Sequence, residues 1–143
     1  MRWKSAVSEL RSLPDAIAQC ADEVDSDPDL VVVFVSPHFE GVLDLVPSLI
    51  RTHIGDSVTL GCLGGGVIGA GREIEGRPGV AISTALFHDV GIVPFYIQEE
   101  ILPDGDASPD AWETLVGVEC SSGPSLMMLT SPFNFDTDKL IAG

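Results

Sequence analysis

Apolar residues follow different spacings along the chain, and each spacing predicts a different element. Between residues 13 and 24 they recur at helical intervals after a Pro and an Asp, a start typical of a helix. Leu30 to Val35 is an uninterrupted apolar run rich in valine, which is typical of a strand buried on both faces. From Glu40 to Ile54 the spacing is helical again, and Pro47 predicts a kink or a late helix start.

Ser57 to Cys62 reads as a second strand, so the chain up to this point predicts a β-α-β unit with its two strands parallel. The runs Val80 to Phe87 and Ile92 to Gln98 are too close together to enclose a helix, so we expect them to form an antiparallel pair. The expected fold class is α/β: a mixed sheet with a β-α-β unit, an antiparallel strand pair and flanking helices. We expect residues 1–143 to form a single domain.

The last third of the chain predicts an acidic surface loop, a short helix from Asp110 to about Val116, a strand from Ser125 to Thr130, and a final helix from Asp136. This strand runs into Ser131-Pro132, as the first runs into Ser36-Pro37. A parallel strand needs a crossover to reach its partner, and the sequence stops at residue 143 before one can form. We therefore expect the N-terminal portion of a longer domain, with the missing C-terminal part or another subunit completing the sheet.

The net charge of the chain limits the classes of molecule that it is expected to bind. The 22 acidic residues outnumber seven basic ones, giving a net charge of −15, which disfavours binding to nucleic acid and to anionic lipid. No apolar stretch approaches the ~18 residues of a membrane span, and none follows the basic N-terminus as in a secretory signal. Three widely spaced cysteines indicate free thiols in a reducing compartment. We expect a cytoplasmic protein with no membrane insertion.

Six of the 15 glycines fall within residues 61–71, directly after the second predicted strand. Such a cluster is typical of a place where backbone approaches a ligand or a neighbouring strand closely. No Lys-Ser/Thr pair follows it, which argues against a phosphate-binding P-loop.

In an open α/β sheet, ligands gather beyond the carboxyl ends of the parallel strands. The predicted strand ends supply Ser36-Pro37-His38, Cys62 with the glycine cluster, and Ser131-Pro132, which we expect on one rim. A thiol at Cys62 and an imidazole at His38 are the groups of a cysteine-dependent hydrolase or transferase, with loop amides as oxyanion donors; the alternative is a small cysteine packed at a strand end. Glu73 and Glu75 share one face of an extended segment, where they either line a pocket or face solvent.

No His, Cys or Asp cluster has the spacing of a zinc or EF-hand site, so no metal or cofactor is expected.

The order of these motifs resembles the FIST N domain, a family named after F-box and intracellular signal transduction proteins. Leu63 and Phe39 depart from the family's usual pattern, which has a small residue and often a second His at these positions. The motifs that carry the resemblance are, in order, Ser36-Pro37-His38, Gly61-Cys62-Leu63-Gly64-Gly65-Gly66, Glu73-Ile74-Glu75, Pro78-Gly79-Val80, Val93-Pro94-Phe95 and Ser131-Pro132-Phe133.

The resemblance implies a sensory domain that binds a small molecule, such as an amino acid, and that is normally followed by a C-terminal partner domain. Our leading hypothesis is a binding module rather than an enzyme. Two other classes stay open: the cysteine enzyme, and a scaffold subunit whose glycines only pack against backbone. The expected ligand contacts are His38, Cys62, Gly64, Gly65, Gly66 and Glu73.

Overall fold

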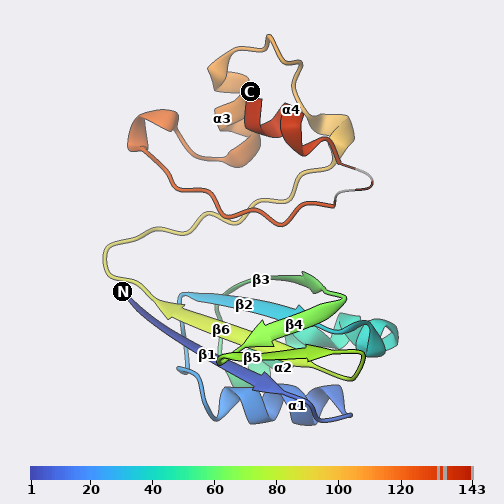
Figure 1. The fold of residues 1–143 in the computed structure, drawn as a ribbon. Coiled ribbons are helices and arrows are strands. Elements are labelled where there is room, and N and C mark those ends of the chain that lie inside the picture. Colours follow the sequence, from blue (N-terminus) through green and yellow to red (C-terminus); the bar gives the residue numbers. More distant parts are fainter. Residues whose placement is uncertain (132, 134, 143) are drawn as a thin grey trace. The chain divides into compact units, whose positions relative to one another are not determined.

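The computed structural model describes residues 1–131, 133 and 135–142, and the chain divides into two compact units (Figure 1). Unit 1 is Met1–Ile92 and unit 2 is Val93–Gly143. Unit 1 holds all the strands of the described chain, and unit 2 contributes short helices and extended segments. Whether residues 1–143 act as one domain stays a prediction.

A four-stranded mixed sheet forms the centre of unit 1. Its strands are β1 (Arg2–Ser8), β2 (Leu30–Val35), β3 (Val58–Leu63) and β6 (Val80–Leu86), in the order β1-β6-β2-β3. β2 and β3 are parallel, whereas β6 pairs antiparallel with both β1 and β2. The predicted α/β class, the β-α-β unit and the interior position of Leu30–Val35 are confirmed.

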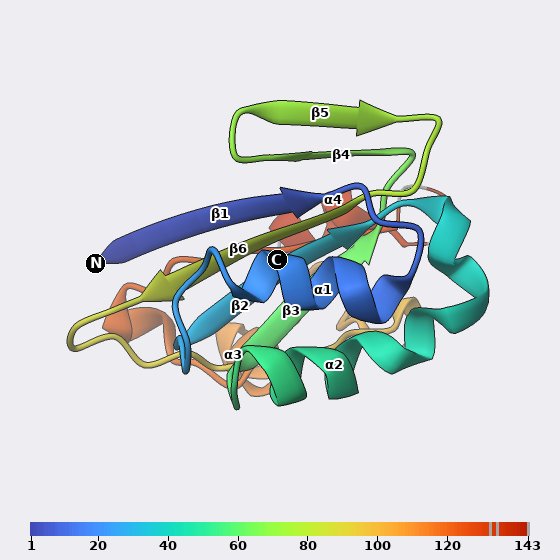
Figure 2. The ribbon, with the colours of Figure 1, turned by 90° about the horizontal axis from the view of Figure 1, so that it is seen from below.

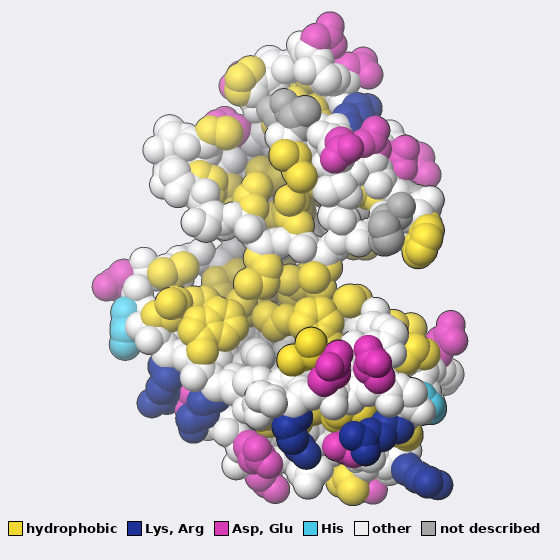
Figure 3. Space-filling view, in the orientation of Figure 1, with side chains coloured by type: hydrophobic (Ala, Val, Ile, Leu, Met, Phe, Trp, Pro, Cys, Tyr) yellow, Lys and Arg dark blue, Asp and Glu magenta, His cyan; other side chains and the backbone are white. Residues whose placement is uncertain are grey.

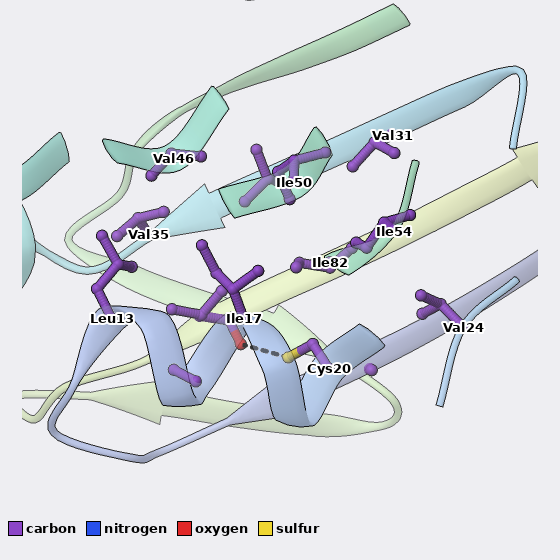
Figure 4. Packing of buried hydrophobic residues seen from close by; sticks show 14 of the residues in the cluster. Leu13, Ile17, Cys20, Val24, Val31, Val35, Val46, Ile50, Ile54 and Ile82 are labelled. Carbon is purple, nitrogen blue, oxygen red and sulfur yellow. Dashed lines mark hydrogen bonds between the residues drawn. The ribbon is translucent and has the colours of Figure 1, made fainter. Parts of the chain in front are cut away.

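Helices cover one face of this sheet (Figure 2). These helices are α1 (Leu13–Ala21), which precedes β2, and α2 (Val46–His53), which follows it. A 3₁₀-helical segment, Pro37–Leu45, connects β2 to α2 and is interrupted at Val42. Pro47 lies in the first turn of α2, so the predicted late start is confirmed. Figure 4 shows the apolar side of α1 directed at β2 and β6. The buried side chains that form this core include Leu13, Ile17 and Cys20 of α1, Val31, Val33 and Val35 of β2, Ile50 of α2, and Ile82 of β6.

A hairpin packs on the opposite face of the sheet. β4 (Gly66–Gly69) and β5 (Arg72–Glu75) are joined by a two-residue turn whose φ angles are +48° and +73°. Two positive φ angles match a type I′ turn, the connection whose twist suits a tight hairpin. Val67 and Ile74, which pair across the hairpin, are buried against Val7, Ala81 and Phe34 of the sheet. Much of the glycine cluster is therefore strand rather than loop.

The prediction that Val80–Phe87 pairs with Ile92–Gln98 is wrong. β6 has β1 on one side and β2 on the other, so neither of its edges is free for a further strand. Residues 92–98 have no regular secondary structure. The antiparallel partners of β6 are β1 and β2, and neither pairing was predicted from the sequence.

Unit 2 contains α3 (Pro109–Val116) and α4 (Thr137–Ala142), with single 3₁₀ turns at Glu99–Ile101 and Cys120–Ser122. Both predicted helices are confirmed. The predicted strand Ser125–Thr130 is wrong: this segment forms no strand, and no strand to pair with it forms in the described part of unit 2. Across the residues with described structure, no helix has the length and apolar character to cross a membrane.

Asp25 anchors β1 to the loop after α1. Its carboxylate lies 3.0 Å from Nε of Arg2 and 3.0 Å from Nζ of Lys4, and its side chain is 9% exposed. The hydrogen bond from Lys4 is the largest cause that lowers the pKa of Asp25 below its ordinary 3.8, and Arg2 lowers it further. The charged carboxylate therefore stabilises the folded state above about pH 4, and this stabilisation is lost as pH falls through the folded-state pKa.

We predict that Asp25→Asn lowers the unfolding free energy at pH 7 and reduces its acid dependence below pH 4. The matched control is Asp56→Asn, because the Asp56 side chain is 93% exposed and lies 3.6 Å from Arg51. Urea denaturation of the three proteins at pH 3 to 7 measures both effects. An Asp25→Asn protein whose stability follows that of the Asp56→Asn protein at every pH would contradict the anchor.

Candidate functional site

The carboxyl ends of β2 and β3 meet the start of β6 at Ser36. Ser36 is buried, its N–H donates to Gly79 O at 2.9 Å, and its Oγ accepts from Gly79 N–H at 2.9 Å. These two hydrogen bonds join Ser36, which directly follows β2, to Gly79, which directly precedes β6. A buried donor without such a partner costs about 1–3 kcal/mol, so this link fixes the rim of the sheet.

The β4–β5 hairpin packs directly against Gly79. A Cβ at this position would lie 2.9 Å from a methyl group of Val67 and 2.9 Å from a methyl group of Ile74. That separation is too short for carbon atoms, so only glycine lets the hairpin pack this closely. Ser36 and Gly79 thus bring the end of β2, the start of β6 and the hairpin to one point.

His38 lies on this rim, at the start of the 3₁₀-helical segment. Its neighbour Phe39 is buried in the core, whereas His38 itself is exposed. His38 Nδ1 lies 3.5 Å from Ser36 Oγ. Gly64 joins the same rim, because its N–H donates to Val35 O at 3.0 Å. The structure therefore brings the predicted residues His38 and Gly64 to adjacent strand ends.

Chain packing accounts for most of the glycine cluster. A Cβ at Gly61 would overlap Val33 O, one at Gly64 would lie 2.8 Å from Gly66 O, and one at Gly66 would lie 2.9 Å from Glu75 Cγ. Gly65 is different, since a Cβ there would have no other atom within 4 Å. Gly65 is exposed, and its backbone takes part in none of the turn and loop hydrogen bonds found in residues 1–131.

The structure does not join Cys62 or Glu73 to His38. Cys62 pairs in register with Phe34, on the sheet face opposite the helices, and is exposed. Glu73 pairs with Ile68 on the outer side of the hairpin, because the alternate residue Ile74 faces the sheet. No hydrogen bond or ion pair among the described side chains joins Cys62 or Glu73 to His38. The predicted rim residue Ser131 follows no strand, and Pro132 lies outside the described residues.

The surface of unit 1 has two hollows that sequence reasoning did not find. One of about 230 Å³ is lined by Val7, Glu9, Leu10, Gln19 and Arg72. The other, of about 400 Å³, lies where β2 and β3 begin and is lined by Asp27, Pro28, Asp29, Asp56, Ser57 and Val58. Neither is lined by any of the six predicted site residues. In the part of the chain that the structure describes, no three His, Cys, Asp or Glu side chains form a group that could hold a metal ion.

The sequence model of the FIST N domain matches residues 29–143. The chain belongs to the FIST N domain family. FIST domains are sensory domains of signal transduction, so the predicted resemblance and its broad functional class are confirmed. Comparison with curated proteins and with solved structures gave no match. The match includes both parallel strands, the rim and the hairpin of this FIST domain.

The three thiols of this FIST domain differ in environment. Cys20 is buried, and burial raises its pKa to about 12, with the nearby charge of Glu23 adding to the effect. A hydrogen bond with Glu113 is the main cause that raises the pKa of Cys120. Cys62 is exposed at the rim end of β3. Faster alkylation of Cys62 than of the other two is therefore expected from the burial of Cys20 and the raised pKa of Cys20 and Cys120, and is no evidence of a catalytic thiol.

The test of the cysteine-enzyme alternative is whether His38 activates Cys62. Because Nδ1 of His38 lies near Ser36 Oγ and no hydrogen bond joins it to Cys62, we predict that His38→Ala leaves the alkylation rate of Cys62 unchanged between pH 6 and 9. Iodoacetamide labelling followed by peptide mass spectrometry measures this rate, with Cys120 as the internal control. A general base contributes about 10²- to 10⁴-fold, so a fall of that size would restore the enzyme alternative.

Proposed function

We propose that this FIST domain binds a small molecule, such as a free amino acid, at the rim formed by Ser36, His38 and the turn Gly64–Gly66. The observation that supports the proposal is Gly65. Its neighbours in the cluster are glycine because the chain packs against them, whereas Gly65 borders open space. A glycine without a packing role is typical of a position where a ligand approaches the backbone closely.

The rim offers complementary polar groups to such a ligand. The Gly65 peptide is exposed and has a backbone N–H to donate to a carboxylate. His38 directs Nδ1 at Ser36 Oγ, which leaves Nε2 of the exposed ring for a ligand. In this site Cys62 supplies an apolar contact beside the turn, and the Glu73 carboxylate binds the ammonium group of the ligand. These two lie on segments that flank the turn on either side in the sequence.

The experiment is a thermal-shift screen of the purified chain with the free amino acids and small carboxylate metabolites. A ligand that binds only the folded state stabilises it by about 2.7 kcal/mol when its concentration is 100 times Kd. We predict that at least one compound raises Tm and that Gly65→Ala weakens its binding by about tenfold, equivalent to about 1.4 kcal/mol. The added methyl group would occupy the ligand's space without disturbing the free protein.

Gly105→Ala is the matched control, because Gly105 is also exposed and a Cβ there also has no atom within 4 Å. The control should bind like the unmodified chain, and both variants should keep the Tm of the free protein. A ligand whose affinity is the same in all three proteins would place binding elsewhere. A screen with no stabilising compound would favour the scaffold class.

A further inference from the structure

β3 forms one end of the sheet, and no strand of the described residues pairs with its outer edge. On its inner side, Val58 N–H donates to Asp29 O at 3.2 Å and Gly64 N–H donates to Val35 O at 3.0 Å. Successive residues of a strand direct their backbone groups to alternate sides, so the N–H and C=O groups of Thr59, Gly61 and Leu63 point away from β2. Thr59 and Gly61 are exposed. No backbone group of the described residues is bonded to this row of groups, which can therefore pair with another strand.

The two ends of the sheet differ in charge. β1, at the other end, carries Arg2 and Lys4, and Arg72 of the hairpin donates to Val7 O at 3.0 Å. Charged side chains and covering groups of this kind keep an edge strand from associating. β3 carries no such charge, because residues 57–71 contain no charged residue and no Pro, in a chain with 29 charged residues. The unprotected edge is the one that a partner would cover.

The sequence of β3 is complementary to a second copy of itself. In an antiparallel pairing centred on Gly61, Thr59 faces Leu63 of the second copy, and Leu60 faces Cys62 of the second copy. These are pairs of uncharged side chains, whereas like charges placed directly opposite destabilise a strand pair. Asp56, the nearest charge before β3, would face Gly66. Although the chain has a net charge of −15, two copies can therefore pair along β3 without placing like charges opposite each other.

We propose that two copies of this chain associate by antiparallel pairing of their β3 strands, which joins the two four-stranded sheets into one. The pairing also extends an apolar surface. Val58, Leu60 and Cys62 alternate onto the sheet face opposite α1 and α2, next to Leu30, Val32 and Phe34. On this side of unit 1, Figure 3 shows hydrophobic side chains gathered together, and the association places the two such surfaces side by side.

Light scattering after size-exclusion chromatography tests the association. We predict a concentration-dependent species of twice the 15.1 kDa chain mass. Thr59→Lys places a cation on the edge and should shift the protein to the monomer at the same concentration. Thr52→Lys, on the exposed surface of α2, is the matched control and should leave the dimer unchanged. Circular dichroism of each variant checks that the fold is kept.

A disulfide tests the register independently of folding stability. In a Cys120→Ser background, Leu60→Cys introduces a thiol opposite Cys62 of the second copy, and oxidised glutathione should convert the pair into a covalent dimer on a non-reducing gel. Val58→Cys is the control, because position 58 faces Gly64 instead. A protein that is monomeric at every concentration would overturn the proposal. So would a dimer that resists Thr59→Lys and gives no selective crosslink at position 60.

Discussion

The exchange of two hydrogen bonds between Ser36 and Gly79 is the constraint on which unit 1 depends. It joins the end of β2 to the start of β6, two segments 43 positions apart in the sequence. The sheet order places β6 between β1 and β2, so the register set at Gly79 extends to both of its neighbours. The hairpin packs on the same residue, and His38 is oriented by the same Ser36 side chain. The candidate site is therefore a consequence of how the sheet is closed at this end.

The sequence predicts those parts of the fold in which the apolar residues of a single helix or strand follow one regular spacing and are buried together. Leu30–Val35 lies between two strands, with a helix-covered face on one side, and its continuous apolar run shows this. α1 and α2 have apolar residues on the one side that faces the sheet. β1 was missed because the polar residues at its start look like a chain terminus, although Ala6 and Val7 are buried. Its pairing with β6 spans almost the whole of unit 1, and local patterns carry no information on such a contact.

The glycine cluster shows what a sequence can and cannot tell about a site. The pattern correctly indicates close backbone approach, yet it does not distinguish a strand or a side chain from a ligand as the approaching group. The structure separates the cases residue by residue: a Cβ at Gly61 would overlap Val33, whereas a Cβ at Gly65 would meet no atom of the described residues within 4 Å. The Ser36–Gly79 link could not be predicted, because the local sequence around a serine that precedes a proline does not indicate which distant residue it bonds to. The grouping of Cys62 with His38 rested on strand ends alone, and in the structure His38 Nδ1 lies 3.5 Å from Ser36 Oγ, with no hydrogen bond joining His38 to Cys62.

Hydrogen exchange at the Gly79 amide tests the central claim most directly. If the Ser36 link holds the rim, this amide exchanges only when unit 1 unfolds, and Ser36→Ala lowers its protection by the cost of an unpaired buried donor, about 1–3 kcal/mol. Ser83→Ala, which removes an exposed hydroxyl pair with Ser5, should leave the Gly79 amide unaffected. A Gly79 amide that exchanges as fast as an exposed loop amide in the unmodified protein would contradict the account.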